Sequence, residues 1–395
     1  MSSILLWILN SIYSLLWSAV VYRTHMLMRD LKRLSFAAPA ADRESKSRVS
    51  AVLQVRNESS TIEETVNALL NQNGVDMQVI VVDDESTDKT CIKLEQIAQE
   101  DPRLNVLRQT KTPPSWSARC YAYEMGQAIA TGDWILFTDG ALKVGPRAVF
   151  NAVATMERER LDHLTLCPRI EAMKFLEAML LPILVLLTHF RFVSAKALEQ
   201  DSGVGVGVGA FNLVNASAYR LRGTHAQIRG SLIDEMALGR IMRADDGRGL
   251  ILRAVGQVRR RYVGGLQELF NFSGSEVWVS CRQSTFLTFL VGTSLVCVPI
   301  VVALSIVNII SFSFEWPWIW LHFLVLVFWG IVAVLGLLRV RGLVRYPVWT
   351  IVFMPIGAML FGFAVLRVTL IALIWKKISW HGHVYRSKDI LNQKK

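Results

Sequence analysis

Cysteine is scarce in this sequence and poorly placed for its usual structural roles. Only five of the 395 residues are cysteine, and no two of them form a Cys-x-x-Cys pair. A disulfide framework or a zinc site needs cysteines at characteristic spacings, so this odd and scattered set argues against both. We therefore expect the main domain to lie in a reducing compartment.

Charged residues are also few, and acidic ones are outnumbered. Charged residues of both signs make up 19% of the chain, against 52% hydrophobic residues, and the formal net charge is +11. The chain is too apolar for an ordinary soluble enzyme and too charged for a pure membrane bundle, so we predict a soluble domain joined to membrane segments. Basic residues stand beside apolar runs, as at Arg29, Arg339 and Lys376. This placement favours membrane surfaces over nucleic acid as the partner.

The first 22 residues are apolar but lack the features of a removable signal peptide. No basic segment precedes the apolar run, and no small-residue cleavage site follows it. The run is just long enough to cross a bilayer, so residues 1–22 are predicted to be a transmembrane anchor. Residues 23–48 are interpreted as a linker, and the basic cluster at its start places the next domain in the cytosol.

Residues 49–262 alternate short apolar runs with amphipathic stretches, and we interpret them as one domain. Strands are expected at 49–55, 79–82, 104–107 and 134–137, with helices at 116–130 and 146–160. Strand and helix alternate at short spacing, which predicts an α/β fold with a mostly parallel sheet covered by helices on both faces.

Two acids, Asp83 and Asp84, directly follow the apolar run 79–82. We expect them in the turn just past the carboxyl end of a buried strand, where open α/β sheets bind their ligands. Carboxylates there can accept hydrogen bonds from a nucleobase or a ribose, or can bind a divalent metal. The alternative is that both acids are solvated turn residues.

The order of these motifs resembles glycosyltransferase family 2, a family of inverting enzymes with the GT-A nucleotide-sugar fold. The matching segments are 55–58 (VRNE), 81–88 (VVDDESTD), 116–119 (WSAR) and 137–139 (FTD). Segments 208–214, 223–225 and 234–238 resemble the acceptor half of a membrane-bound branch that includes hopanoid-associated and carotenoid glycosyltransferases. The resemblance covers residues 49 to about 283.

The resemblance implies a nucleotide-sugar site with a divalent metal, Mg²⁺ or Mn²⁺. Its donor-binding residues would be Asn57, Glu58, Asp83, Asp84, Arg119 and Asp139. Asp139 stands where the family's metal-binding Asp-x-Asp begins, but Ala141 replaces the second acid. One carboxylate can suffice if the diphosphate and water supply the other ligands. Arg119 could contact the phosphates, or could lie on a solvated helix face.

Sugar transfer also needs a carboxylate base, because the acceptor hydroxyl loses its proton as it attacks. By the resemblance, Glu235 stands where the family has its catalytic carboxylate, most often an Asp, and Asp234 is the second candidate. The alternative is that both acids only favour a helix N-terminus. His225 could touch donor or acceptor, or could be structural.

The rest of the chain is expected at or in the membrane. Residues 173–193 and 263–283 are interpreted as interfacial amphipathic helices, 284–376 as membrane segments and 377–395 as a basic tail. The predicted spans are 286–312, 316–338 and 348–375. Three full spans would leave the basic tail outside, and a re-entrant break at 355–357 would remove that conflict.

These features predict a multi-pass cell-membrane enzyme with a cytosolic catalytic domain. We expect it to move a sugar from a nucleotide sugar, UDP-hexose, to a hydroxyl of a membrane lipid such as a carotenoid or hopanoid. One alternative is a non-catalytic membrane protein that retains the GT-A fold. Another is a polysaccharide synthase, which the absence of a Gln-x-x-Arg-Trp signature disfavours.

Overall fold

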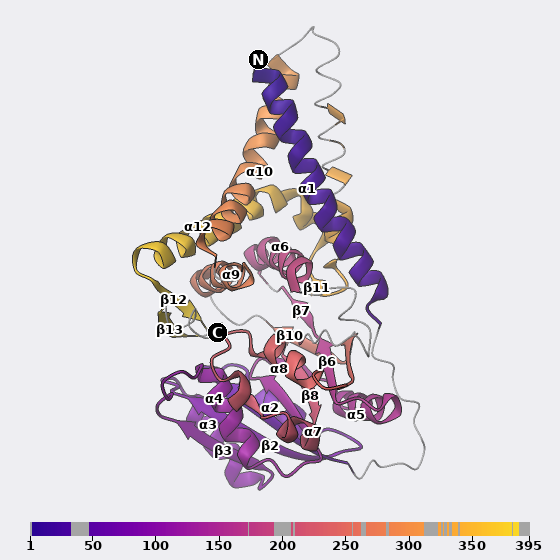
Figure 1. The fold of residues 1–395 in the computed structure, drawn as a ribbon, viewed down its shortest axis with the longest axis vertical. Helices are drawn as coiled ribbons and strands as arrows, with labels where there is room; N and C mark the ends of the chain where they lie inside the picture. The colour runs from indigo at the N-terminus through magenta and orange to yellow at the C-terminus, as the bar shows by residue number, and fades with distance from the viewer. Residues whose placement is uncertain are drawn as a thin grey trace. The chain divides into compact units, whose positions relative to one another are not determined.

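In the computed structural model the chain consists of two compact units (Figure 1). The α/β unit comprises Leu31–Glu171, Ser194–Val263 and Lys388–Lys395, and the helical unit comprises Met1–Asp30, Ala172–Val193 and Gly264–Ser387. The structure describes residues 2–32, 47–172, 174–192, 207, 210–254, 256–261, 266–281, 284–311, 323–324, 327, 330–331, 334–338, 340–380 and 382–386. Most of the predicted linker therefore lies outside the described residues.

A seven-stranded sheet forms the centre of the α/β unit, with the strand order β3-β2-β1-β4-β8-β6-β9. The strands are β1 (Arg48–Val55), β2 (Asp76–Asp84), β3 (Leu104–Gln109), β4 (Trp134–Asp139), β6 (His163–Cys167), β8 (Phe211–Asn215) and β9 (Gly249–Arg253). Only β8 among these seven runs antiparallel to its neighbours. The prediction of a mostly parallel sheet is confirmed.

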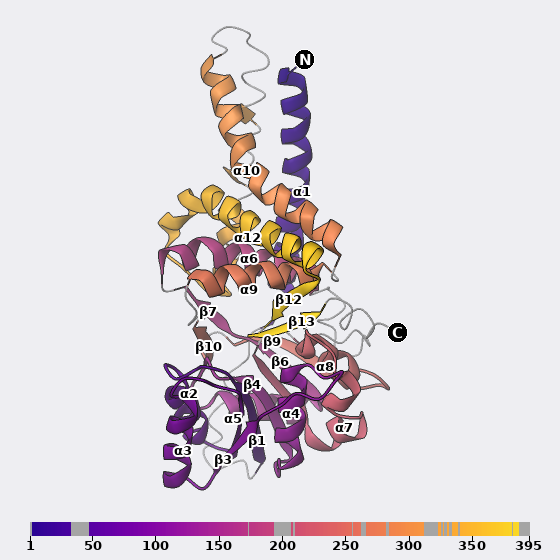
Figure 2. The same ribbon diagram turned by 90° about the vertical axis from the view of Figure 1, so that its left-hand side faces the viewer.

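Helices cover both faces of this sheet (Figure 2). One face packs against α2 (Ile62–Leu70) and α5 (Ala148–Glu159), and the other against α4 (Ala118–Ala128), α7 (Ala216–Leu221) and α8 (Asp234–Met242). Side chains alternate along β1, so Leu53 packs in the first layer and Val52 in the second. Both residues are fully buried, because a sheet covered on both faces needs apolar residues at successive positions.

A small second sheet lies next to the carboxyl end of β4. Its strand β5 (Leu142–Val144) follows β4 after two residues, and β10 (Val258–Arg261) pairs antiparallel with β5. On its other side, β10 pairs parallel with β7 (Arg169–Glu171). This arrangement places Arg260 of β10 beside Asp139, the last residue of β4.

The helical unit is built from long apolar helices. They are α1 (Ser2–Asp30), α6 (Phe175–Phe192), α9 (Leu266–Ser280), α10 (Thr285–Ser311) and α12 (Met354–Ile374), with the hairpin β12 (Lys377–Trp380) and β13 (His383–Arg386) after them. Helices α9 and α12 pack closely at Gly274, where a Cβ atom would lie 2.6 Å from the carbonyl oxygen of Ala364. Small residues at such crossings are typical of helices that associate in membranes.

One described helix, α12, is long and apolar enough to cross a bilayer, and half of its most apolar window is buried. The predicted span 348–375 is split in the structure, because Val348–Phe353 form a separate 3-10 helix before α12. The predicted anchor and the span 286–312 coincide with helices α1 and α10, while 316–338 lies largely outside the described residues. Helix α1 continues to Asp30, beyond the predicted end of the anchor.

The cysteines are divided between the two units. All five are free, and Cys120, Cys167 and Cys281 are buried. Burial raises the pKa of the Cys167 thiol to about 12, so this side chain stays protonated at neutral pH.

Candidate active site

The carboxyl ends of β1, β2 and β4 place several acids at one edge of the sheet. Strand β1 lies between the other two, with Val55 in register with Asp83 of β2 and Gln54 in register with Asp139 of β4. Neighbouring strands are about 4.8 Å apart, so the backbones of Asp83 and Asp139 are separated by about 10 Å. That spacing is suited to a ligand lying across the strand ends.

The sequence analysis predicted Asp83 and Asp84 in a turn, and this prediction is wrong. Both acids are the last two residues of β2. Pairing with β3 extends β2 through both acids, since Asp84 lies in register with Gln109. Asp84 is fully buried, and its two carboxylate oxygens accept hydrogen bonds from Nε2 of Gln54 at 2.8 Å and Nε2 of Gln109 at 2.9 Å. Asp83 is 5% exposed, and its Oδ1 has no hydrogen-bond partner in the described structure. Of the two acids, Asp83 has the oxygen that can bind a ligand.

Asn57 joins the loop after β1 to the loop after β2. Its Oδ1 accepts a hydrogen bond from the backbone N–H of Thr87 at 2.8 Å, and its own N–H donates to Oγ of Ser86 at 3.0 Å. The backbone of Asn57 has a φ of 54°, a left-handed conformation that asparagine tolerates better than most residues. The predicted ligand residue therefore fixes the shape of the two loops that border the site.

Glu58 lies beside the last residues of β4. A Cβ atom added to Gly140 would lie 3.3 Å from Cγ of Glu58, so the two residues are in close contact. The Oε2 atom of Glu58 accepts a hydrogen bond from the hydroxyl of Thr61 at 2.9 Å, and its backbone N–H donates to Oγ1 of Thr90. Glu58 thus lies near Asp139, on the loop that Asn57 holds.

Arg119 of α4 faces two acids at the start of α8. Its Nη2 lies 2.9 Å from Oε1 of Glu235, and its Nε lies 3.4 Å from Oδ2 of Asp234. The Arg119 side chain is 11% exposed, so this contact is largely shielded from water. Ser117 begins α4 by accepting a hydrogen bond from the N–H of Cys120, which fixes the helix end that carries Arg119.

The two acids differ in their access to solvent. The side chain of Asp234 is 3% exposed, and that of Glu235 is 18% exposed. Burial raises the pKa of the Asp234 carboxyl, the nearby Arg119 partly opposes this shift, and the neighbouring Glu235 adds to it. Asp234 therefore tends to keep a proton, and Glu235 is the more accessible carboxylate.

The sequence analysis offered phosphate contact or a solvated helix face for Arg119, and the structure pairs this residue with two acids. Tyr123, one helical turn further along α4, accepts a hydrogen bond from Nε of Arg119 at 3.2 Å and donates one to the carbonyl of Thr138. Tyr123 was missed by the sequence analysis. Its spacing of four residues from Arg119 is the signal that could have found it.

His225 lies in an aromatic cluster behind the site. It is fully buried, its ring contacts those of Tyr123, Phe137 and Tyr219, and Nδ1 is hydrogen-bonded to the Tyr219 hydroxyl. Burial, and secondarily the charge of Arg119, lowers the pKa of His225 to about 3. The histidine is therefore neutral, and its surroundings are those of a structural residue.

Asp139 pairs with an arginine from the second sheet. Nη2 of Arg260 lies 2.9 Å from Oδ2 of Asp139, and Oδ1 accepts a hydrogen bond from the N–H of Ala141 at 3.3 Å. No group of three or more His, Cys, Asp or Glu side chains is placed to hold a metal within the described ranges. The residues present therefore fit a metal only if a ligand brings most of its oxygens.

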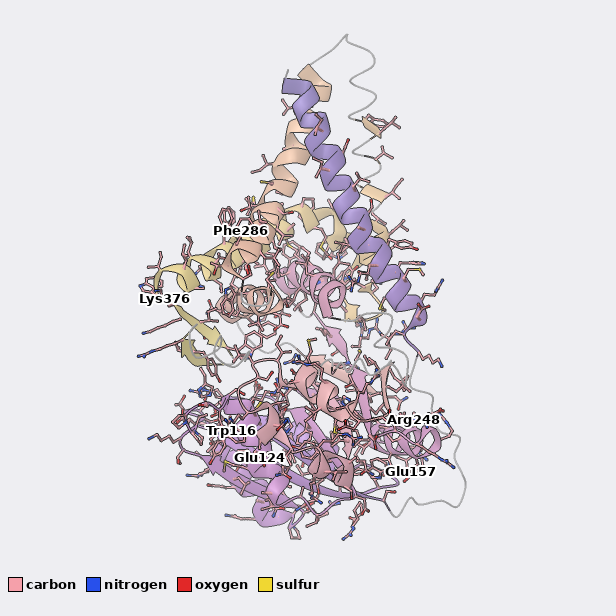
Figure 3. The ribbon with its side chains drawn as sticks, in the orientation of Figure 1. Trp116, Glu124, Glu157, Arg248, Phe286 and Lys376 are labelled. Carbon is pink, nitrogen blue, oxygen red and sulfur yellow. The ribbon has the colours of Figure 1, made fainter. Side chains whose placement is uncertain are left out.

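Other polar side chains near α4 have structural partners. Glu124, labelled in Figure 3 with Trp116, accepts hydrogen bonds from the side chain of Gln127 and the backbone of Ala226. A cavity of about 230 Å³ lies at the amino ends of β1 and β2, lined by Arg48 among others, and so at the opposite edge of the sheet from the acids. We do not assign it to the site.

Comparisons with known proteins agree with this geometry. Residues 50–221 match the model of the family described as Glycosyl transferase family 2. No curated protein sequence matches the chain.

Three solved structures align with most of the chain. The mannosyltransferase PcManGT from Pyrobaculum calidifontis, in complex with GDP-Man and Mn²⁺, is 15% identical, with a TM-score of 0.51 over 92% of this chain and 97% of its own. S. aureus TarS with UDP-GlcNAc is 14% identical (TM-score 0.40, 85% of this chain and 95% of its own). Glucosyl-3-phosphoglycerate synthase from Mycobacterium tuberculosis, with Mn²⁺, UDP-Glc and phosphoglyceric acid, is 18% identical (TM-score 0.38, 64% and 88%). The similarity to the first structure shows that the α/β unit has the GT-A fold.

Proposed function

We propose that this chain, a glycosyltransferase whose residues 50–221 match the model of glycosyl transferase family 2, transfers a sugar from a nucleotide sugar to a hydroxyl of a membrane lipid. The observation that carries the proposal is the Arg119–Asp234–Glu235 cluster, which presents one accessible carboxylate near the sheet edge where Asp139 lies. Transfer to a hydroxyl requires such a base together with an adjoining donor site.

The donor site is assigned to the ends of β1, β2 and β4. Asp83 offers a buried, unpartnered oxygen to the base or ribose of the nucleotide, and Glu58 and Asp139 border the diphosphate and sugar. UDP-hexose is our preferred donor. UDP-GlcNAc and UDP-Glc accompany two of the structures compared above, and GDP-Man accompanies the third, so GDP-mannose belongs in the same test.

The base is assigned to Glu235. The acceptor oxygen attacks the anomeric carbon as the bond from that carbon to the diphosphate oxygen breaks, and the hydroxyl proton passes to Oε of Glu235. A single displacement of this kind inverts the anomeric configuration. Arg119 holds the Glu235 side chain in one orientation, and Asp234 lies on the same guanidinium.

A divalent metal, Mg²⁺ or Mn²⁺, is the cofactor that Asp139 would hold together with the diphosphate. Two of the compared structures contain Mn²⁺ with a nucleotide sugar. The metal would neutralise the charge that develops on the departing diphosphate. Because Ala141 replaces the second acid, we assign this chain a single metal-binding carboxylate.

Exposed apolar side chains support a lipid acceptor. Among the described residues, the large apolar side chains that the α/β unit exposes are Ile92, Ile129 and Leu221. The helical unit exposes many more, including Phe286 (labelled in Figure 3), at 72%, and Leu373, at 61%. Such surfaces are typical of membrane contact, and α12 is long enough to span. Within lipids we propose an isoprenoid hydroxyl, on a carotenoid or hopanoid, as the first acceptor to test, because segments 208–214 and 234–238 resemble that branch.

Basic residues at the ends of two apolar helices support a cell-membrane location with the α/β unit in the cytosol. Arg23 and Arg29 lie in the last turns of α1, and Lys376 and Lys377 follow α12. Basic residues at the ends of apolar helices favour the cytosolic side. Helices α6 and α9 are proposed to lie at the interface. Protease protection of inverted membrane vesicles tests this orientation, and resistance of the α/β unit to protease outside the vesicles would contradict it.

The function is tested by release of nucleoside diphosphate from detergent-purified full-length protein. UDP-hexoses and GDP-mannose are supplied with and without membrane lipid extract, with Mn²⁺, Mg²⁺ or chelator, and the lipid product is analysed by mass spectrometry and by NMR of its anomeric configuration. We expect turnover that needs lipid extract and gives an inverted product. Nucleotide binding without turnover on any lipid would contradict the lipid-acceptor proposal.

Two substitutions of the same chemistry serve as test and control. Glu235→Gln removes the base and should lower kcat by about a thousandfold or more while leaving nucleotide binding intact. Glu157→Gln changes an exposed residue of α5 and should leave kcat unchanged. Equal activity of the two variants would exclude Glu235 as the base.

A further inference from the structure

Each oxygen of Asp139, the residue assigned to the metal, has a neighbouring group, although Oδ2 makes no hydrogen bond in the described structure. Oδ1 accepts the N–H of Ala141, and Oδ2 lies 2.9 Å from Nη2 of Arg260. The Asp139 side chain is only 14% exposed. A metal ion approaching the free protein would therefore meet a carboxylate that is paired and largely shielded from water.

Arg260 is placed for this contact by strand pairing and not by local sequence. It stands on β10 in register with Leu142 of β5, which begins three residues after Asp139. The preceding residue, Arg259, lies in register with Lys143 and points to the opposite face of the strand. Arg259 instead pairs with Glu171 at 3.4 Å and is half exposed. Two adjacent arginines of the same charge thus have different partners, and only Arg260 reaches the site.

A guanidinium and a divalent metal that share one carboxylate oxygen repel each other. Mg²⁺ binds carboxylate oxygens at about 2.0–2.1 Å, which would place it within a few ångströms of the cationic Arg260, where the repulsion is strong. Ala141 supplies no second carboxylate to offset that repulsion. A diphosphate would offset it, since it brings at least two negative charges and oxygen ligands for both cations.

We propose that Arg260 is a diphosphate-binding residue that pairs with Asp139 until the donor binds. The metal then binds only together with the nucleotide. When the metal and the diphosphate bind, Oδ2 of Asp139 exchanges Arg260 for the metal, and the guanidinium moves to a diphosphate oxygen. This inference rests on the proposed function, because it requires a nucleotide-diphosphate ligand. It also accounts for a single acid at this position, because Arg260 supplies positive charge beside the metal.

Binding measurements on the full-length protein test the inference without any turnover. The free Mn²⁺ signal in electron paramagnetic resonance gives metal binding, and calorimetry gives the affinity for UDP or GDP. The wild-type protein should bind Mn²⁺ at least about tenfold more tightly with the nucleotide than without it. Arg260→Gln should bind Mn²⁺ without nucleotide about tenfold or more tightly than wild type, and should bind nucleotide in the presence of Mn²⁺ about tenfold or more weakly.

Arg259→Gln is the matched control, since it removes the same charge from the adjacent residue. It should behave as wild type in both measurements, and Arg260→Lys should restore part of the nucleotide affinity. Indistinguishable Arg260→Gln and Arg259→Gln proteins would overturn the inference, and so would wild-type Mn²⁺ affinity that nucleotide does not change. Failure of every variant to bind either nucleotide would instead overturn the proposed function.

Discussion

Arg119 makes an ion pair with Glu235, with 2.9 Å between Nη2 and Oε1, and the same guanidinium lies 3.4 Å from a carboxylate oxygen of Asp234. One buried cation therefore faces two acids. If both acids are ionised, the cluster carries one net negative charge in a poorly hydrated place. The raised pKa of Asp234 relieves that charge, so the arrangement favours a protonated Asp234.

Substitution of Arg119 should therefore affect both stability and turnover. Arg119→Met leaves Asp234 and Glu235 without their cation and should lower the free energy of unfolding by about 3 kcal/mol and kcat by about a hundredfold or more. Arg119→Met/Glu235→Gln also removes the carboxylate that lies 2.9 Å from the guanidinium and should recover most of the stability without recovering kcat. Urea denaturation and diphosphate release measure the two effects.

Arg158→Met is the control for this pair of variants. Arg158 lies on the surface of α5, is 57% exposed and pairs with the neighbouring Glu159, so its removal should change the unfolding free energy by less than about 0.5 kcal/mol. If Arg119→Met proves as stable as Arg158→Met, the buried cluster does not contribute in the way argued.

The difference in stability between the Asp234→Asn variant and the wild type should depend on pH in a defined direction. The folded pKa of Asp234 is raised, so between the unfolded pKa and the folded one the folded state binds more protons than the unfolded state. Wild-type stability therefore falls as pH rises through that window. Asp234→Asn should be more stable than wild type at pH 8, and the difference should shrink towards pH 4. Urea denaturation at a series of pH values measures this.

Asp88→Asn should show the opposite sign. Burial opposes the shift, but hydrogen bonds from Ser59 and Thr90 prevail and lower the pKa of Asp88 to about 2. Its contribution is present above the unfolded pKa and is lost as pH falls through the folded pKa. Asp88→Asn should therefore be less stable than wild type at pH 7, by about 1–2 kcal/mol, with the difference closing in acid. The same sign for both variants would refute the assignment.

Asn57 should control nucleotide affinity through the loops that it joins. Asn57→Gly keeps the left-handed backbone but loses the acceptor for the Thr87 N–H, and Asn57→Ala also adds backbone strain. We expect unfolding free energies lower by about 1 kcal/mol for Gly and about 2 kcal/mol for Ala. Hydrogen exchange at the Thr87 amide should quicken in both, and UDP should bind more weakly. Unchanged exchange at Thr87 in the Gly variant would show that the side chain does not hold the loop.

Much of the fold could be predicted from the sequence because the β-branched runs at 49–55 and 79–82 are buried on both faces. The direction of each strand could not, since alternation does not show that β8 runs antiparallel. The end of β2 was also misplaced. Aspartate disfavours strands locally, but pairing of Asp84 with Gln109 of β3 extends the strand through both acids.

The site was predictable where it follows strand ends and helix starts. Asp139 ends β4 and Asp234 begins α8, as their sequence context indicated. The partner of Arg119 was not predictable, because more than a hundred residues separate it from Glu235. Gln54 was missed as well, although a glutamine in an otherwise apolar strand is a signal for a buried polar partner, here Asp84.

Asp83 and Asp84 should give different results when each is changed to asparagine, despite being neighbours. Asp84 accepts hydrogen bonds from two glutamine amides, so Asp84→Asn places a donor against a donor and should lower the unfolding free energy by about 1–3 kcal/mol. Asp83 has an unpartnered oxygen, so Asp83→Asn should unfold like wild type but bind UDP about tenfold or more weakly. Urea denaturation and calorimetry on the same preparations separate the two effects. If both variants lose stability, Asp83 has a structural role. If both variants lose only affinity for UDP, Asp84 belongs to the nucleotide site.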